Sequence, residues 1–552
     1  MPPDGEATYA HSTCTLCPGG CGITVRLIDG RAVKIEGREG HPVNQGGICP
    51  LGLSGLQLLY GPTRVQTPLK RVGDRGAGHW QRISWETAIG EVAEILSGLR
   101  GSGQAHTVAA ISSRDRGTVA GLLERFLTAY GSPNFMRMPS MEDAQELGLY
   151  ITQGVLGSVG YDFENADYVL SFGSGLIDGW GAPVRMFQAN SGWRETGARV
   201  VQIENRLSNT AAKADQWVSI RPGTEADLAL GIAHVMVAEE LYATSFVNRH
   251  TADFDDLRSA LEGYSPEAVT ATTGVPTETI VALANAFSEA ESPVAVYGRG
   301  KGQVPGSLKE VLAVMALNAL AGSINQPGGM WAIPEGDGIA WPDIETDEIA
   351  AEGLQKARID GAGSKQFPNS RYLLNRLPEI LAEGSSYALK ALFIDDANPL
   401  YSLADAAAVR NAFEQIPTIV SFASHMDETA ALADYILPSH VYLERYEDVA
   451  VTAGLKTRTI GLAQPVIGPL FDTQHVGDTI LQLAQALDEP IAAAFPWDDY
   501  QACLEEAMGD KWDSLEAAGV WSDEAFAADP EADFETASGD FEFVGDAGSE
   551  VL

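Results

Sequence analysis

Long apolar runs and basic residues are both scarce in this chain of 552 residues. The longest apolar candidate, VLAVMALNALAGSINQPGG, is interrupted by Asn318, Ser323 and Asn325, so we interpret it as a buried helix and not as a membrane span. Lysine and arginine together number 36 against 75 acidic residues, which gives a net charge of −39. This balance argues against nucleic acid as a partner, because like charges repel phosphate.

The excess of acidic residues is typical of a solvated surface that works at high salt, where screening removes the self-repulsion of the charges. We therefore interpret the chain as halophilic, in preference to an acidic patch for a cationic partner. The N-terminal segment MPPDGEATYAHSTC contains no apolar signal region and no twin arginine. The expected location is the cytoplasm, and the alternative is an extracytoplasmic, membrane-associated protein that is exported with a partner.

Cysteine is also rare, and four of the five cysteines fall in one N-terminal segment with the spacing C-x2-C-x3-C-x27-C. A disulfide framework is a poor interpretation, since a chain of this size needs no such cross-links and one cysteine would remain. Zinc is the more serious rival, but structural zinc sites usually draw their ligands from two separated pairs. Three cysteines in one loop with a distant fourth are typical of a [4Fe–4S] cluster. The predicted ligands are Cys14, Cys17, Cys21 and Cys49.

Strand-like and helix-like segments alternate along most of the remaining chain. A helix is predicted to begin after Ser84 as its N-cap. Short buried strands are predicted in AHTVAAIS, ADYVLSFG, GARVVQIE, SPVAVYG, LKALFID and IPTIVSFAS. Alternating strands and helices are typical of parallel sheets covered by helices on both faces. The chain contains more strand–helix pairs than one such domain needs, so two domains are predicted. The fifth cysteine, Cys503, lies in the helical pattern DDYQACLEEAM and is predicted to be a core residue.

The predicted fold class is therefore α/β, with a small N-terminal iron–sulfur domain and two doubly wound parallel-sheet domains around a cofactor cleft. We assign the iron–sulfur domain to residues 1–60 and the first α/β domain to residues 61–104 and 370–505. The second α/β domain takes residues 105–369, and residues 506–552 are expected to form a flexible acidic tail.

Ligands of parallel sheets bind beyond the carboxyl ends of the strands, and five predicted strand ends carry polar loops. These loops are rich in glycine, asparagine, arginine and acidic residues, a composition that suits a long cofactor with several phosphates. Ordinary turn and helix-capping chemistry is the alternative for any one of them. We expect the loops to line one cleft, with the following candidate cofactor-binding residues: Ser174, Gly175, Asp178, Glu204, Asn205, Arg206, Arg299, Lys301, Asn398, Asp427, Glu428 and Thr429.

Several of these segments resemble the molybdopterin oxidoreductases of the dimethyl sulfoxide reductase type. The cysteine region, ENADYVLSFG, the stretch VVQIENRLSNTAAKADQWVSIRPGTEADLALGIAHVM, and the loops DDANPL and SHMDETAALADYILPSHVYLERYED all share the likeness. CPGGCGITVRLIDGRAVKIEG and HPVNQGGICPLGLSGLQLLYGPTRV look most like the branch of polysulfide, thiosulfate and menaquinone reductases.

The resemblance implies two molybdopterin guanine dinucleotides with molybdenum or tungsten between the α/β domains, and electron transfer between that metal and the cluster. It implies that Glu204 binds guanosine and that Pro222, Gly223 and Thr224 form the turn that follows. It also implies a ferredoxin-like iron–sulfur subunit as partner, and in a membrane complex an anchor subunit.

Three departures from the family pattern carry weight. Leu51 stands where a lysine or arginine usually bridges cluster and pterin. The segment GSPNFMRMPSMEDAQE offers Ser140, Glu142 and Asp143, but no cysteine, as a ligand to molybdenum. The segment after Lys511 resembles the join to the family's C-terminal barrel, which we expect to be supplied by a separate chain.

Two functional hypotheses follow. The first is a molybdopterin-dependent oxidoreductase subunit, with Glu142 and His425 as candidate catalytic residues in its funnel. The second is a molybdenum-free subunit that keeps the cluster as an electron relay or scaffold, in which Glu142 is only a helix-start carboxylate behind Ser140 as N-cap. A nucleotide-binding enzyme with a zinc site remains a third and weaker hypothesis.

Overall fold

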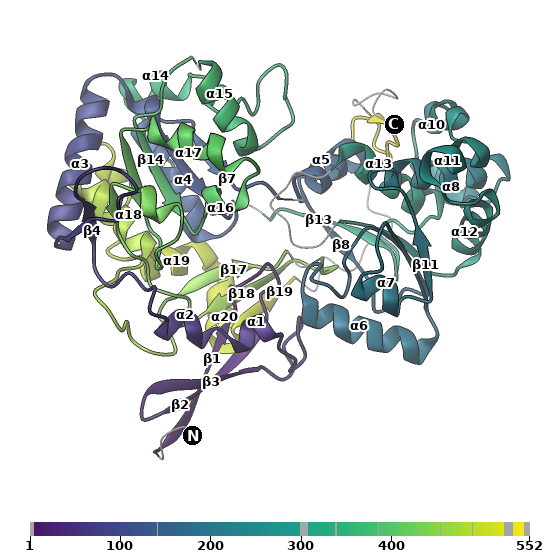
Figure 1. Cartoon of the computed structure of the whole chain (residues 1–552), viewed down its shortest axis with the longest axis horizontal. Coiled ribbons are helices and arrows are strands. Elements are labelled where there is room, and N and C mark those ends of the chain that lie inside the picture. Colours follow the sequence, from purple (N-terminus) through teal and green to yellow (C-terminus); the bar gives the residue numbers. More distant parts are fainter. Residues whose placement is uncertain are drawn as a thin grey trace.

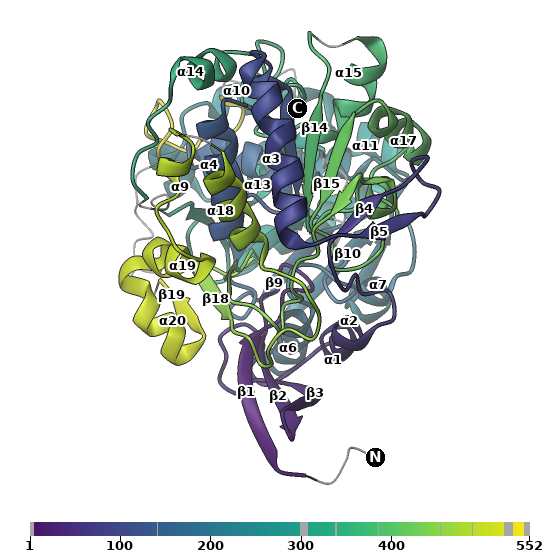
Figure 2. The ribbon, with the colours of Figure 1, turned by 90° about the vertical axis from the view of Figure 1, so that its left-hand side faces the viewer.

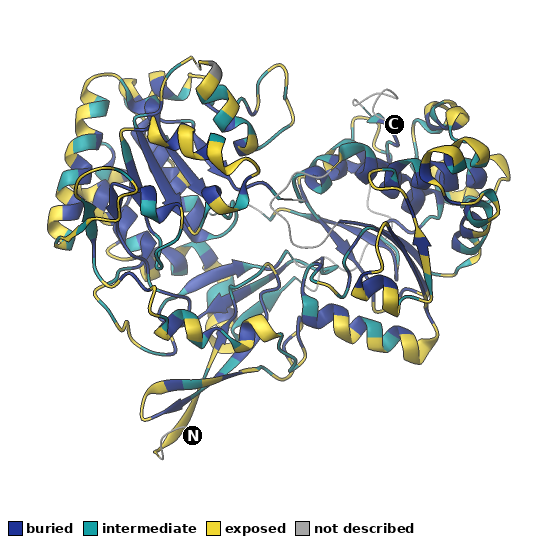
Figure 3. Ribbon diagram, in the orientation of Figure 1, coloured by how far each residue is buried: buried dark blue, intermediate teal, exposed yellow. Residues whose placement is uncertain are grey.

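The structure is a computed structural model that describes residues 5–140, 142–298, 307–336, 339, 341–384, 386–452, 454–487, 489–523 and 534–545. Two α/β units lie side by side, and a small N-terminal sheet extends from the junction below them (Figure 1). Strands form the buried interior of both units, whereas the outer faces of the helices are exposed (Figure 3). The chain arrangement therefore matches the predicted division into one small domain and two α/β domains.

The N-terminal sheet contains three antiparallel strands in the order β1 (Ala7–Thr13), β2 (Gly22–Ile28) and β3 (Arg31–Gly37). The turn between β2 and β3 consists of Asp29 and Gly30, both with positive φ, which is the conformation that tight hairpins require. Two short helices follow, α1 (Pro50–Leu53) and α2 (Leu56–Tyr60). The cysteine loop between β1 and β2 and the cysteine before α1 are thereby held close together.

The first α/β unit is built on a seven-stranded sheet in the order β5-β4-β16-β15-β14-β6-β7. The pairs from β16 to β7 are parallel, whereas β4 and β5 join the edge as antiparallel strands. The strands are β4 (Leu69–Arg71), β5 (Trp80–Arg82), β6 (Val108–Ser112), β7 (Phe135–Arg137), β14 (Ala391–Asp395), β15 (Thr418–Ser421) and β16 (Tyr435–Ile436).

Helices cover both faces of this sheet. On one face α3 (Trp85–Gly101), α4 (Thr118–Tyr130) and α18 (Val476–Ala486) pack together, and Figure 2 shows α3 and α18 in front of β14 and β15. The other face carries α15 (Leu377–Glu383), α16 (Pro399–Ser402) and α17 (Ala406–Glu414). The predicted start of α3 is confirmed, because the Ser84 hydroxyl accepts a hydrogen bond from the Thr87 amide at 3.1 Å.

The second α/β unit has a four-stranded parallel sheet in the order β11-β10-β9-β12. Its strands are β9 (Tyr168–Phe172), β10 (Arg199–Glu204), β11 (Gln216–Ser219) and β12 (Pro293–Tyr297). A separate two-stranded antiparallel sheet, formed by β8 (Gly157–Tyr161) and β13 (Met330–Pro334), belongs to the same unit. Its helices are α5 (Glu142–Gln153), α6 (Pro183–Thr196), α7 (Asn209–Lys213), α8 (Glu225–Ala238), α9 (Thr244–His250), α10 (Phe254–Ala260), α11 (Pro266–Thr273), α12 (Thr277–Glu289) and α13 (Leu308–Leu320).

The apolar segment that might have suggested a membrane span forms α13, which is buried almost throughout its length against α5, α8 and β12. Asn318 in this helix is fully buried and binds the backbone of Ala295 on β12 through its side chain. Within the part of the chain that the structure describes, no helix has both the length and the apolar character needed to cross a bilayer. The interpretation of α13 as a core helix is confirmed.

The predicted domain boundary at residue 105 is wrong. It separates β6 and β7 from β14, but β6 pairs in parallel with β14 from Val108↔Ala391 to Ser112↔Asp395. The first unit therefore extends through β7, and the chain enters the second unit at α5. Strand pairing over such a distance along the chain is set by tertiary contacts, which a local pattern of strands and helices does not contain. The small helix α14 (Glu348–Leu354) also packs against α4 of the first unit.

The expected flexible acidic tail is likewise corrected for the residues that the structure describes. After α19 (Tyr500–Met508) and α20 (Trp512–Ala518), β19 (Val520–Ser522) completes an antiparallel sheet with β17 (Glu447–Ala450) and β18 (Thr459–Ala463). Farther on, Phe541 and Phe543 are fully buried in the core of the second unit. Aromatic side chains within a strongly acidic segment thus anchor it, because their burial outweighs its overall polarity.

Candidate functional site

Four cysteine side chains line one small cavity between the N-terminal sheet and α1. Cys14 follows β1, Cys21 precedes β2, and Cys49 is the N-cap residue of α1. The Cys14 amide donates a hydrogen bond to the Cys21 carbonyl at 2.8 Å, which closes the loop that carries Cys17. The rest of the wall is mostly apolar and consists of Leu16, Ile48, Leu51, Gly52, Pro183 and Val184.

Two glycines allow the backbone to approach the thiols. The Gly52 amide lies 3.5 Å from the Cys49 sulfur and donates toward it. A Cβ at Gly19 would lie only 3.2 Å from the Cys17 sulfur and 3.4 Å from the Ala182 backbone. Backbone amides that point at sulfur stabilise the negative charge of thiolates and of the sulfide ions of a cluster.

Asn44 fixes the loop that brings Cys21 and Cys49 together, and the sequence pattern did not identify it. Its side chain is fully buried and makes two 2.9 Å hydrogen bonds to the backbone N–H and C=O of Gly22. The same amide donates to the Gly47 carbonyl at 2.7 Å. A lone asparagine in a glycine-rich loop gives no local signal of such a role, because all three partners are known only from the folded loop.

The donor set of this cavity fits a [4Fe–4S] cluster. Each iron of such a cluster takes one cysteine thiolate, so the four thiols need only surround a common space. Among the residues that the structure describes, no three His, Cys, Asp or Glu side chains are placed to share one metal ion. The wall around the four thiols is mostly apolar, and Cys17 also lines the larger polar cavity.

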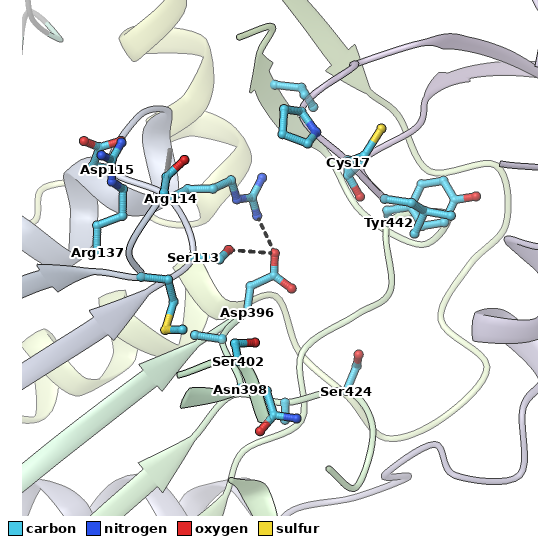
Figure 4. Close-up of a pocket in the computed structure, with 18 of the residues that line it drawn as sticks. Cys17, Ser113, Arg114, Asp115, Arg137, Asp396, Asn398, Ser402, Ser424 and Tyr442 are labelled. Atoms are coloured by element: carbon cyan, nitrogen blue, oxygen red, sulfur yellow. Dashed lines mark hydrogen bonds and ion pairs between the residues drawn. The ribbon is translucent and has the colours of Figure 1, made fainter. Parts of the chain in front are cut away.

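A second and much larger cavity, of about 950 Å³, opens at the carboxyl ends of β6, β7, β14 and β15. This is the edge at which open parallel sheets bind ligands. Figure 4 shows its polar wall, with Arg114 and Ser113 directed at Asp396 and with Cys17 and Tyr442 on the opposite side. The lining includes Thr15, Leu16, Cys17, Arg114, Asp115, Arg116, Arg137, Ser140, Glu142, Gly181, Asp396, Asn398, Ser402, Ser424, His425, Asp427, His440, Tyr442, Arg445 and Thr452.

An ion-pair network underlies the polar wall. Glu447, whose side chain is 2% exposed, lies 2.5 Å from Arg114 and 2.6 Å from Arg445. Burial alone would raise the pKa of Glu447, but the guanidinium groups of Arg114 and Arg445 outweigh it and lower the pKa to about 2. Arg114 also reaches Asp396 at 3.3 Å. Arg114 is therefore fixed in place by carboxylates from distant parts of the chain, and Arg445 by the carboxylate two residues after it.

Two further arginines of the wall, Arg116 and Arg137, form ion pairs and each also has a buried Nε–H group without a hydrogen-bond partner in the described chain. Arg137 pairs with Asp115 at 3.0 Å, and Arg116 pairs with Glu146 at 2.7 Å. Both arginines line the cavity, and guanidinium groups suit phosphate or another anionic group. The size of the cavity and these donors fit a large anionic cofactor.

Glu142 begins α5 and lines the large cavity. Its amide donates to the Ser140 hydroxyl at 3.2 Å, and the Asp143 carboxylate accepts from the Ser140 amide at 2.9 Å. These contacts confirm the expected capping role of Ser140 and the position of both acids in the first turn. Burial raises the pKa of Glu142. Glu142 thus serves the helix start and also faces the cavity, so the two interpretations of this residue are compatible.

His425 lines the cavity and is half-buried. Its Nε2 lies 3.1 Å from the Leu58 carbonyl and therefore carries the proton, while Nδ1 lies 3.0 Å from the Ser424 hydroxyl. Burial lowers the pKa of His425, and burial lowers that of the neighbouring His440 to about 4. Both imidazoles are therefore neutral at physiological pH, and a catalytic role for His425 stays a prediction.

Asn398 and Asp427 are the predicted cofactor residues that line the large cavity. Glu428 and Thr429 lie behind Asn398: its side-chain amide donates to Glu428 at 2.7 Å and accepts from the Thr429 hydroxyl at 2.7 Å. These two residues orient Asn398. Arg299 and Lys301 lie outside the described residues.

The other predicted cofactor residues lie at the carboxyl edge of the second sheet and do not line this cavity. Ser174 is fully buried and donates to the Val296 carbonyl at 3.2 Å. Asp178 accepts from the amide of Thr210 at 2.9 Å at the start of α7. The Glu204 carboxylate accepts from the Ser208 hydroxyl at 2.5 Å. The contacts of Asp178 and Glu204 belong to the start of α7, and that of Ser174 joins two strand ends. Cofactor binding by Ser174, Gly175, Asp178, Glu204, Asn205, Arg206, Pro222, Gly223 and Thr224 stays a prediction.

The sequence analysis did not identify the loop after β6 as part of the site, although ligands of parallel sheets bind beyond the carboxyl ends of the strands. The segment SRDRG follows the strand AHTVAAIS, and its Ser113, Arg114, Asp115 and Arg116 all line the cavity. The same rule identifies Arg137 at the end of β7. Tyr442 and Arg445 come several residues after the end of β16, in an irregular loop, so the strand-end rule did not single them out.

A four-thiolate site beside a large polar cavity at the edge of a parallel sheet defines an iron–sulfur protein that holds a second, anionic cofactor. Comparison with known proteins agrees with this class. The molybdopterin oxidoreductase family model matches residues 64–485, and the molybdopterin oxidoreductase Fe4S4 domain model matches residues 7–61. The chain belongs to the molybdopterin oxidoreductase family. The predicted family and fold class are confirmed, and the two matches support molybdopterin and a [4Fe–4S] cluster as its cofactors.

Individual relatives confirm the predicted branch. The chain is 34% identical to the menaquinone reductase molybdopterin-binding-like subunit of Nitratidesulfovibrio vulgaris, over 93% of this chain and 70% of that protein. It is 29% identical to the thiosulfate reductase molybdopterin-containing subunit of Salmonella typhimurium, over 90% of this chain and 66% of that protein. The fold is shared with acetylene hydratase from Pelobacter acetylenicus, with a TM-score of 0.82 and 22% identity over 97% of this chain and 77% of that chain. The chain thus spans about two thirds of the length of these two curated relatives.

Proposed function

We propose that this chain is the molybdopterin-binding subunit of a multi-subunit oxidoreductase, in which electrons pass between the large cavity and a cluster held by the four N-terminal cysteines. The observation that carries the proposal is that Leu16 and Cys17 line both cavities. A redox group in the large cavity would lie one side chain away from the cluster. The shared wall supports an electron path through Cys17.

When bound, the pterin and its metal would supply the oxidation or reduction of substrate. The chain's own residues hold and orient that group. Asn398 and Ser424 offer hydrogen bonds at strand ends, and the guanidinium groups of Arg116 and Arg137, which line the cavity, suit its anionic groups. Glu142, which lines the cavity, would supply an oxygen donor to the metal, and the neutral His425 can accept a proton at Nδ1 if the Ser424 hydroxyl turns away.

The partners we propose are a ferredoxin-like iron–sulfur subunit, a membrane anchor and a separate chain that supplies the barrel domain. Relatives named for menaquinone and thiosulfate reduction support a quinone-linked respiratory complex. Leu51 and Leu53 on α1 are 47% and 49% exposed immediately after Cys49. An apolar surface next to the cluster suits docking of an electron-transfer partner.

A second candidate function is a molybdenum-free electron relay. Two observations favour it. Leu51, at the position where the family usually has a cation, lines the cysteine cavity with an aliphatic side chain. Among the described lining residues of the large cavity, the single thiol is that of Cys17, which belongs to the cluster set. The metal would then have no sulfur ligand from the protein, and a carboxylate is a harder donor.

Metal analysis of the complete complex, matured with its own partner chains, separates the two functions. Stoichiometric molybdenum or tungsten supports the oxidoreductase, and iron without either metal supports the relay. For Glu142, the X-ray absorption edge of the bound metal should change in Glu142→Ala. Glu86→Ala is the matched control, because Glu86 occupies the first turn of α3 on the surface. An unchanged spectrum in Glu142→Ala would remove Glu142 as a ligand.

A further inference from the structure

Tyr442 lines the large cavity, packs in the same buried cluster as Cys14 and Cys21, and has a buried hydroxyl that the described chain leaves unsatisfied. Its side chain is 3% exposed, and its hydroxyl has no hydrogen-bond partner within the described residues. The nearby Tyr60 hydroxyl, in contrast, donates to the Ala32 carbonyl at 2.9 Å. A buried hydroxyl without a hydrogen-bond partner is unfavourable, so a partner that the protein chain does not supply is expected at this point.

The position of Tyr442 is fixed by a rigid turn. The Glu444 amide donates to the Val441 carbonyl at 2.8 Å, and the Val441 amide donates to the Glu444 carboxylate at 3.1 Å. Glu444 is in turn paired with Arg64 at 2.9 Å, with both side chains fully buried. The ring of Tyr442 therefore has a fixed place in the wall of the large cavity.

The hydroxyl extends toward the segment that follows Cys49. A Cβ at Gly55 would lie 2.1 Å from the Tyr442 oxygen, so only glycine leaves room for it. One turn earlier, a Cβ at Gly52 would lie 3.9 Å from the Cys14 sulfur. Tyr442 also packs in the same buried cluster as Cys14, Cys21 and Cys49. In Figure 4 the Tyr442 oxygen and the Cys17 sulfur both point away from Arg114 and Asp396.

We propose that the Tyr442 hydroxyl donates a hydrogen bond to a sulfur of the cluster, or of its Cys14 ligand, and thereby raises the cluster's reduction potential. This inference rests on the assignment of the cluster to the four cysteines. The reduced cluster carries one more negative charge than the oxidised cluster, so a donor at its sulfur stabilises the reduced form. Tyr442 is thus a positioning residue that tunes electron exchange with the large cavity.

The test is an EPR-monitored redox titration of the intact complex. Tyr442→Phe keeps the ring and removes the donor, and it should make reduction of the cluster about tenfold less favourable, a shift of about 59 mV to more negative potential for one electron. Iron content should be unchanged. Tyr168→Phe is the matched control, because Tyr168 is 4% exposed and its hydroxyl is also buried without a partner in the described chain, but it lies on β9. Its potential should equal that of the wild type.

An iron-replete Tyr442→Phe complex with the wild-type potential would overturn this inference alone, and a water molecule would then be the partner of the hydroxyl. Wild-type complex without iron would overturn the cluster assignment together with it. If Tyr442→Phe fails to retain iron, the reduction potential of Gly55→Ala provides the test. The added Cβ would displace the Tyr442 hydroxyl while the tyrosine itself remains. We expect the same negative shift in Gly55→Ala, and an unchanged potential there would refute the proposal.

Discussion

Asn44 and Gly22 are joined by a pair of hydrogen bonds of 2.9 Å, in which the asparagine amide satisfies both the N–H and the C=O of the glycine. Gly22 follows Cys21 directly, and the segment from Asn44 to Gly47 leads to Cys49. One buried side chain therefore sets the distance between the three-cysteine loop and the fourth cysteine. The cluster site depends on this contact although Asn44 offers no ligand.

Asn44→Ala should reduce iron binding, because it leaves the Gly22 and Gly47 backbone groups buried without their partner. Three hydrogen bonds at about 1 kcal/mol each are lost. Iron per chain and the visible absorption of anaerobically purified protein measure the effect. Asn411→Ala, on the exposed side of α17, is the control and should retain full iron. Equal iron in both variants would show that the loop holds its shape without Asn44.

Cys49→Ser should weaken or abolish the cluster. A hard alkoxide is a poorer ligand for iron–sulfur than a thiolate, and Cys49 is the single ligand contributed by the α1 side of the cavity. Wild-type protein should carry about four irons per chain with an absorption that bleaches on reduction. Cys503→Ser is the matched control, since Cys503 is buried in α19. Stoichiometric zinc without iron in the wild type would contradict the assignment.

Asp395→Asn should flatten the pH dependence of thermal stability. Burial, and to a lesser degree repulsion by Asp396, raises the pKa of Asp395 from its ordinary value of 3.8 to about 6. The folded chain thus holds this proton at a pH where the unfolded chain has lost it. The associated stability is complete below about pH 4 and is lost as the pH rises through about 6, a change of roughly 3 kcal/mol.

In a series of Tm measurements across this range, the wild type should lose stability with rising pH relative to Asp395→Asn, whose amide stays neutral. Asp74→Asn on the surface serves as the control and should follow the wild-type curve. Parallel curves for the wild type and Asp395→Asn would mean that the carboxyl group ionises normally in the fold.

Glu444→Gln should lower Tm substantially, because it leaves the Arg64 guanidinium buried without a counter-charge. Both side chains are fully buried, and breaking such a pair costs about 3–5 kcal/mol. The exposed pair of Lys34 and Glu36 offers the comparison: Glu36→Gln should change stability by less than about 1 kcal/mol. Similar Tm values for the two variants would show that water reaches the Arg64 pair.

Phe541→Ala should release the C-terminal segment from the second unit. Phe541 is fully buried and lies 5.3 Å from Phe543 and 6.0 Å from Phe534, measured between ring centroids. Removing a buried phenylalanine costs about 3–5 kcal/mol. Limited proteolysis should cut the variant near this segment faster than the wild type. Phe187→Ala, at an α6 position that is 51% exposed, should leave the digestion unchanged.

Local patterns allowed much of the fold to be predicted. The start of α3 at Ser84, the core helix α13, and the buried strands β6, β9, β10, β12, β14 and β15 follow from capping residues and runs of apolar side chains. The boundary at residue 105 failed because the pairing of β6 with β14 depends on contacts between distant segments. The acidic tail was misjudged because composition averages over the few aromatic side chains that anchor it.

Spacing in the sequence is sufficient to predict the four cysteines as cluster ligands, because three of them share one loop and loop length limits where they can lie. The tertiary structure alone decided the wall of the large cavity. Glu444 neutralises Arg64 across 380 residues of chain, and Glu447 pairs with the distant Arg114. Which carboxylate meets which arginine, and that Tyr442 reaches Gly55, depend on how the sheets and the N-terminal domain pack. Such contacts form only when the chain is folded, so no local pattern records them.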